Sequence, residues 1–228
     1  MPRIGAVLLV CALAAAACGG DASDNGIARL SATDALTKVK AALAKVESVH
    51  ISGHFTAAGT SYAVDLRDKT GAGTGTLTVG GGEIDLVRVG DNMYLKGDAG
   101  ALTAFGASSA QASLIAGKWL RQSVATQGPF SPLTSLLDLK DFFNSVTTPQ
   151  GVVKTGAATT INGHKVVTLV DTQAGGNGTL YISETGDPLP VRIEQPGSSG
   201  GSLDFDYGVS VDAKVPSGAV DLSQLTGR

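Results

Sequence analysis

Three histidines and two cysteines are the only soft metal ligands in the 228-residue chain. His50 and His54 lie four residues apart, a spacing that on a helix would direct both imidazoles towards one metal ion. The segment around them alternates apolar and polar residues, as a strand does, so we expect both side chains on its solvent-exposed face. Neither cysteine has a second cysteine at a spacing that zinc sites use. The pattern therefore predicts no metal centre and no disulfide framework.

Other candidate chemistry is equally sparse. The glycine-rich stretches 71–75 and 197–201 lack the Lys-Ser/Thr ending of a phosphate-binding loop, and no Gly-x-Ser-x-Gly elbow occurs. Asp85, Asp204 and Asp206 alternate with apolar neighbours, which is typical of the polar face of a strand. We expect no cofactor and no enzymatic activity. A hydrolase outside the cytoplasm is the alternative, and it would need a nucleophile and a base brought together by the fold.

Cys18 is the residue with the clearest chemical role. It follows an apolar run of fourteen residues from Ile4 to Ala17, which is shorter than the roughly 20 residues that span a bilayer. A cysteine directly after small residues is similar to the bacterial lipobox, in which the thiol is acylated before cleavage. We therefore expect residues 1–17 to be a lipoprotein signal peptide and Cys18 to be the site of lipidation. Cys11 would leave with that peptide.

Lipidation of Cys18 would place the protein at a membrane surface. A single acyl chain gives only marginal affinity for a membrane, whereas two or more hold a protein firmly. Residues 19–26 are small and polar, so we expect residues 18–30 to form a lipidated, flexible tether. The expected location is the extracytoplasmic face of the cell membrane, with the folded domain in residues 31–228.

Composition limits the possible partners. The formal net charge is −3, so the sequence lacks the basic surface that nucleic-acid binding requires. Apolar residues make up 43% of the chain and charged residues 16%, which excludes disorder caused by high charge. The 31 glycines and 8 prolines favour turns over long helices. We expect a monomeric globular domain.

The expected elements begin with one amphipathic helix, at about 33–47. Leu36, Val39, Leu43 and Val46 recur there at helical spacing, after capping chemistry at Ser31. The period then changes to two, and glycine-rich turns separate short strands in a meander. These strands are expected near 49–56, 62–67, 73–80, 83–90 and 92–97.

Residues 98–148 interrupt the strand pattern. We expect a weak helix at 102–116, a strand at 118–124, and an apolar helix or helix pair at 133–146. Strands return afterwards, with Asn162-Gly163 as the clearest hairpin signal. They are expected at 151–157, 164–171, 178–183, 190–195 and 202–211. The fold class is α+β, with about eleven strands.

Several motifs occur in an order that resembles the actinobacterial lipoprotein family of LppX, LprA, LprF and LprG, whose fold is similar to the LolA and LolB lipoprotein carriers. They cover nearly the whole chain after residue 17. They are the lipobox at Cys18, the helix before the first strand, Gly117-Lys-Trp-Leu120, residues 160–166, Gly178-Thr-Leu-Tyr-Ile182, residues 186–194, residues 203–208 and Val215-Pro216.

The resemblance implies a single, strongly curved antiparallel sheet, wrapped as a half-barrel around a few helices. It also implies a hydrophobic cavity that accepts acylated lipids, and a role in moving or presenting lipids of the cell envelope. No catalytic residues belong to that family picture.

The residue pattern favours the same architecture. Strand twist accumulates in a sheet of about eleven strands, so the sheet curls and its apolar side becomes concave. With few aromatic side chains to fill it, that side could leave room for alkyl chains. The residues expected to line a lipid cavity there are Phe55, Tyr62, Val64, Leu66, Leu77, Val79, Ile84, Leu86, Met93, Leu95, Leu180, Ile182, Val191, Ile193, Leu203 and Phe205.

Two hypotheses remain open at this point. In the first, the protein is a membrane-anchored carrier that binds an acylated lipid or glycolipid, exchanges it with an envelope lipid transporter, and uses residues 101–146 as a cover. In the second, the same apolar side chains pack on Leu36, Val39, Leu43 and the 133–146 helix. The protein is then a non-catalytic scaffold or interaction lipoprotein without a ligand.

Overall fold

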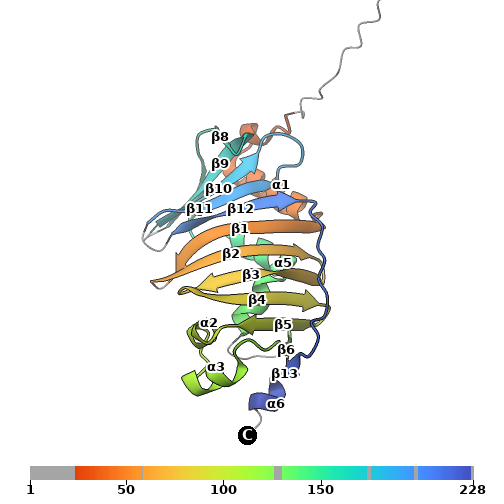
Figure 1. The fold of residues 1–228 in the computed structure, drawn as a ribbon. Helices are drawn as coiled ribbons and strands as arrows, with labels where there is room; N and C mark the ends of the chain where they lie inside the picture. Colours follow the sequence, from red (N-terminus) through yellow and green to blue (C-terminus); the bar gives the residue numbers. More distant parts are fainter. Residues whose placement is uncertain (1–23, 58, 126–129, 174–175, 198–199, 227–228) are drawn as a thin grey trace, which may run out of the picture.

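The structure is a computed structural model, and it describes residues 24–57, 59–125, 130–173, 176–197 and 200–226 (Figure 1). Within these residues one sheet of thirteen strands dominates the molecule. The strands are β1 (Ser48–Ala57), β2 (Thr60–Lys69), β3 (Ala72–Val79), β4 (Gly82–Val89), β5 (Asn92–Gly97), β6 (Leu120–Ser123), β7 (Val152–Thr155), β8 (Thr159–Ile161), β9 (His164–Gln173), β10 (Gly176–Ser183), β11 (Pro190–Gln195), β12 (Gly201–Tyr207) and β13 (Val220–Asp221).

Two antiparallel meanders make up the sheet. β1 to β6 pair in chain order, and β9 to β12 pair in chain order, with β7 beyond β9. β1 and β12 join the two meanders, with Ile51 opposite Phe205. The sheet is open and curved, with β13 and β7 at its two ends (Figure 1). The expected fold class and the curved single sheet are confirmed.

The strand count is higher than the expected eleven because two short strands escape the sequence pattern. β8 has three residues and β13 has two, too few to show an alternating period. β13 pairs in parallel with β6, Val220 opposite Leu120, so only the returning C-terminal segment creates it. The hairpin expected at Asn162-Gly163 joins β8 to β9, and both residues have positive φ angles, 49° and 81°, as a type I′ turn requires.

The helices are shorter than expected. They are η1 (Ile27–Arg29), α1 (Ala32–Leu43), α2 (Ala99–Ala104), α3 (Ser109–Ile115), α4 (Ser131–Leu136), α5 (Leu139–Val146) and α6 (Ser223–Thr226). The helix expected at 102–116 is divided because Ser108 caps a new helix with a capping box. The 133–146 segment is a helix pair, since Asp138 accepts a hydrogen bond from the Asp141 backbone and starts α5.

Residues 24–30 are attached to the folded body, so the expected flexible tether is shorter than residues 18–30. Residues 24–30 were expected to belong to its flexible part, but the Asn25 backbone donates to Glu184 O at 2.9 Å, and Asp24 forms a bridge with Thr185. Ile27 is only 1% exposed. It is the first large apolar residue after Cys18, and its burial fixes the segment to the body. Cys18 and residues 18–23 lie outside the described residues.

Glycines permit the sheet to bend. Gly53 in β1 and Gly75 in β3 have φ angles of 145° and 156°, which L side chains rarely adopt. A Cβ atom on Gly75 would lie 2.0 Å from the Asp65 carbonyl oxygen. Glycine within a strand is typical of such close backbone approach and of strong local curvature.

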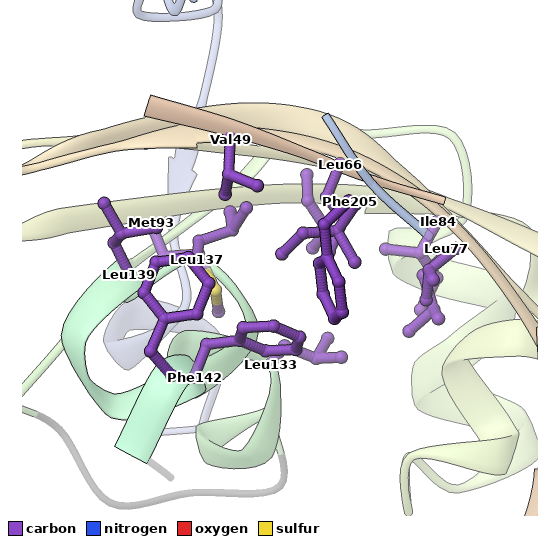
Figure 2. Packing of buried hydrophobic residues seen from close by; sticks show 14 of the residues in the cluster. Val49, Leu66, Leu77, Ile84, Met93, Leu133, Leu137, Leu139, Phe142 and Phe205 are labelled. Carbon is purple, nitrogen blue, oxygen red and sulfur yellow. The ribbon is translucent and has the colours of Figure 1, made fainter. Parts of the chain in front are cut away.

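The hydrophobic core lies between the concave face of the sheet and the helices. Figure 2 shows the sheet arching over α4 and α5, with Val49, Leu66 and Phe205 pointing from the strands towards the helical side chains. Leu133 and Leu137 are 1% and 0% exposed. Each side chain of this size contributes roughly 1.5–3 kcal/mol when it is fully buried. This packing holds α4 and α5 against the centre of the sheet.

Candidate functional site

Two hollows on the concave side adjoin the C-terminal half of α5. The first, which we call the sheet-end hollow, has a volume of about 210 Å³ and lies between strands β7, β9, β10 and β11, α1 and residues 145–150. Its apolar lining includes Leu36, Val146, Val153, Leu169, Leu180 and Ile193.

The second, which we call the interhelix hollow, lies between α1 and α5 and has a volume of about 360 Å³. Leu43, Val46, Leu139 and Phe143 form much of its apolar wall. This volume falls in the range of roughly 300–1,000 Å³ that small-molecule sites occupy, whereas the sheet-end hollow is smaller.

Thr147 borders both hollows, so they adjoin at the end of α5. Its side-chain hydroxyl donates to Phe143 O at 2.7 Å, and the residue is 4% exposed. The hydrogen bond satisfies a polar group that would otherwise be buried without a partner. The two hollows therefore meet at the residue that follows α5.

The structure brings most of the predicted lining residues together. Fifteen of the sixteen belong to the hydrophobic cluster of the concave face. Eleven are buried: Val64, Leu66, Leu77, Val79, Ile84, Leu86, Met93, Leu95, Leu180, Ile182 and Phe205. Four are partly buried against the cluster: Phe55, Tyr62, Ile193 and Leu203.

Val191 is the residue outside that cluster. It lines a separate depression of about 300 Å³, to which Leu189, Phe205 and Tyr207 also belong. The register between β10 and β11 shifts at Tyr181 and Ile182, and Val191 lies at this irregularity, where strict alternation of side chains does not hold. This irregularity is not visible in the sequence.

Few of the predicted residues border open space. Leu180 and Ile193 line the sheet-end hollow, and none of the sixteen lines the interhelix hollow. Aromatic side chains of α5 pack against aromatic side chains of β12 on the concave face. The rings of Phe142 and Phe205 are 6.1 Å apart, and those of Phe143 and Tyr207 are 6.3 Å apart. The protein thus fills much of its concave face with its own helices.

Sequence reasoning missed the residues that complete the hollows. Leu169 and Val153 come from strands that were expected, but they were not assigned to a cavity. Val146 and Phe143 belong to the segment that was expected to act as a cover. Leu169 has no clear signal in the sequence, because the residues of β9 from Val166 to Leu169 are all buried and show no alternation of exposed and buried positions.

A polar contact fixes the junction of α4 and α5 to the sheet. Nη1 of Arg88 on β4 donates to Leu137 O at 2.6 Å and to an Asp138 carboxylate oxygen at 2.8 Å. The Arg88 side chain is 12% exposed, so water screens this ion pair less than a surface pair. The contact holds the helical cover at one defined position.

Asp68 lies in the same cross-strand row as Arg88, with Gly73 between them. Asp68 is fully buried, and neither carboxylate oxygen accepts a hydrogen bond within the described part of the chain. Burial raises the pKa of Asp68 to about 7, although the nearby Arg88 guanidinium opposes this shift. A Cβ on Gly73 would lie 2.9 Å from Asp68 Oδ1, so a larger residue there would displace the Asp68 carboxylate.

The convex face carries His50, Asp204 and Asp206, in agreement with their alternation with apolar residues in the sequence. His50 Nε2 lies 2.9 Å from Asp65 and Nδ1 lies 3.4 Å from Asp206, while Arg192 binds Asp204 through two contacts of 2.8 and 3.0 Å. Across the described residues, no group of three His, Cys, Asp or Glu side chains could hold a metal ion. No helix in that part of the chain is long and apolar enough to cross a membrane.

Comparison with known proteins identifies the fold. No family model matches the sequence, and no curated protein matches it. LprF from Mycobacterium bovis is similar in structure, with 15% identity, a TM-score of 0.56, and coverage of 82% of this chain and 97% of LprF. The Mycobacterium tuberculosis lipoprotein LppX has 15% identity, a TM-score of 0.50, and coverage of 84% and 100%. The chain therefore has the fold of these proteins, as the resemblance implied.

Proposed function

We propose that this protein is a membrane-anchored, extracytoplasmic lipoprotein that binds the acyl chains of a lipid or glycolipid on the concave side of its sheet and carries or presents that lipid in the cell envelope. The observation that carries the proposal is the pair of adjoining, largely apolar hollows that share Thr147. The fold that the chain has in common with LppX, a lipoprotein, is consistent with it.

Hydrocarbon is the chemistry that these hollows suit. Leu43, Leu139 and Phe143 offer no hydrogen bonds, so a polar group placed against them would lose its hydration without compensation, whereas an alkyl chain would not. Each methylene buried from water contributes about 0.8 kcal/mol. The free energy of moving a lipid from a bilayer into the hollow is small, because the membrane interior is already apolar. Binding close to balance allows the protein both to take up and to release its ligand.

The anchor is the second part of the proposal. The body begins by Asp24, which pairs with Thr185, so six residues from Cys18 to Ser23 would separate it from an acylated thiol. Six residues reach at most about 20 Å, which keeps the body close to the membrane surface. Replacing Cys18 by alanine should release a folded protein into the medium, as cell fractionation would detect. Retention of this variant in the membrane would contradict the anchor.

The lipid site is tested by filling the sheet-end hollow. Leu180→Trp places a larger side chain in its wall and should reduce uptake of a labelled lipid by about tenfold. Tyr181→Trp is the matched control, because Tyr181 is the next residue of β10 and directs its hydroxyl to Glu194 on β11. Native mass spectrometry after mild purification would identify a bound lipid. Equal uptake by both variants would contradict the proposed site.

A scaffold without a ligand is the second candidate function. It is favoured by the dense packing of most concave side chains against the protein's own helices. In that case the protein acts through its surface on an envelope partner. An empty protein in native mass spectra, together with no uptake of labelled lipid by the wild type, would support the scaffold.

A further inference from the structure

The two hollows differ in the charges of their linings. The interhelix hollow is lined by ten residues, of which Lys40 and Lys140 are the charged ones. The sheet-end hollow has Asp171 as its charged lining residue. Both carboxylate oxygens of Asp171 already accept backbone hydrogen bonds, at 2.6 Å from Gln150 N and 2.8 Å from Gly151 N.

The two lysines come from opposite walls of the interhelix hollow. Lys40 belongs to α1 and Lys140 to α5, and both residues are exposed. The apolar wall between them is formed by residues that are almost inaccessible to water, with Leu43 5% exposed, Leu139 8% and Phe143 6%. Lysine side chains keep their ammonium groups in water while their stems cover apolar surface. The hollow therefore combines a cationic rim with an apolar interior.

We propose that the interhelix hollow binds the headgroup end of an anionic amphiphile, with a carboxylate or phosphate between Lys40 and Lys140 and the start of the alkyl chain against Leu43, Leu139 and Phe143. This inference rests on the proposed function. It adds the sign of the headgroup's charge and the hollow that the headgroup occupies. Ammonium groups bind carboxylate and phosphate as strong, charge-assisted hydrogen-bond donors.

The position of Thr147 gives the ligand a direction. A chain that extends past Thr147 leads into the sheet-end hollow, where Leu180 and Ile193 continue the apolar surface. The carboxylate of Asp171 in the lining of the sheet-end hollow would repel an anionic headgroup placed there. The anionic end of the ligand thus belongs between α1 and α5, and the tail belongs towards the strands.

The experiment compares palmitate with hexadecanol, which have the same chain length and differ in headgroup charge. The test variant is the double substitution Lys40→Met/Lys140→Met, which removes both charges and keeps apolar stems. The control is Lys118→Met/Lys214→Met, which changes the net charge equally at two exposed positions outside both hollows. Affinities are measured at pH 8 by calorimetry with the full chain, in low and high salt, and thermal unfolding checks that both variants fold.

We expect the wild type and the control to bind palmitate about tenfold more tightly than hexadecanol at low salt. The test variant should lose that tenfold preference and bind hexadecanol as the wild type does. High salt should reduce the palmitate affinity of both the wild type and the control towards that of the test variant. Lys40→Met and Lys140→Met singly should each lose part of the preference.

Two results would overturn this further inference and leave the proposed function intact. One is equal binding of palmitate and hexadecanol with no effect of the lysine substitutions, which leaves lipid binding intact but without charge selection. The other is competition by inorganic phosphate at the same concentration as palmitate, which would identify a site for small anions. If neither palmitate nor hexadecanol binds the wild type, the proposed function itself fails.

Discussion

The concave face is more densely filled over one half of the sheet than over the other. Over β2 to β5, the inward side chains of Leu66, Leu77, Ile84, Leu86 and Leu95 are all exposed by 1% or less. Over β9 to β11, Leu180 is 7% exposed and Ile193 is only partly buried, and a hollow lies above them. Both halves consist of antiparallel strands, and the inward side chains of both are mainly aliphatic.

The difference comes from the chain that covers each half. The 98–148 insertion supplies α2 to α5, and contacts of α2 with β3 and β4 and of α4 with α5 close the first half. The second half has α1 and the non-helical segment 147–151 above it. Close packing requires side chains from both sides of a layer. Space for a ligand therefore occurs where the helical cover ends.

Replacing one leucine by alanine in each half should give the largest difference in stability between the two halves. Leu86→Ala should lower the free energy of unfolding by about 3–5 kcal/mol, because Leu86 is fully buried and its surroundings cannot collapse. Leu180→Ala should cost about 2–3 kcal/mol and enlarge the sheet-end hollow. Chemical denaturation measures both values. Equal losses would mean that the two halves are packed alike.

The buried carboxylate in the filled half should make stability depend on pH. The pKa of Asp68 is raised to about 7 in the folded state, so the folded protein binds more protons than the unfolded chain between pH 4 and 7. Stability should be greatest near pH 4 and should fall by on the order of 2–4 kcal/mol as the pH rises to 7. Above pH 7 this contribution is constant.

Asp68→Asn should remove that dependence, because an amide does not titrate in this range. The variant should be more stable than the wild type at pH 8, while both should be similar at pH 4. Asp65→Asn on the exposed side of the same strand is the control. Parallel stability curves for the wild type and Asp68→Asn would show that Asp68 is not the titrating group.

The contact of Arg88 with the α4–α5 junction should have a smaller, more local effect. Arg88→Gln leaves Leu137 O and the Asp138 carboxylate without their donor and should cost about 1–3 kcal/mol. Hydrogen exchange should accelerate in residues 131–146 and remain unchanged in α2. Arg88→Lys keeps the charge and should retain part of the protection. Uniform acceleration over the whole chain would contradict a local role in holding the cover.

Much of the fold could be predicted because strand alternation is a local property. The six strands of the first meander were predicted from residue patterns to within a few residues, and the Asn162-Gly163 hairpin followed from turn chemistry alone. The alternating period also identified which side chains face inward, and fifteen of sixteen lie in one cluster. The exception, Val191, follows a break in strand register.

Which inward residues border open space depends on contacts between distant segments. Phe142 packs on Phe205, 63 positions further along the chain, and Arg88 fixes Asp138 across 50 positions. The sequence by itself predicted the strands, their apolar face and the candidate anchor at Cys18, because these depend on neighbouring residues, whereas the pairing of β1 with β12 joins distant parts of the chain. The tertiary structure alone decided where the helices fill that face and where they leave it hollow, because packing is settled by side chains that meet only in the folded chain.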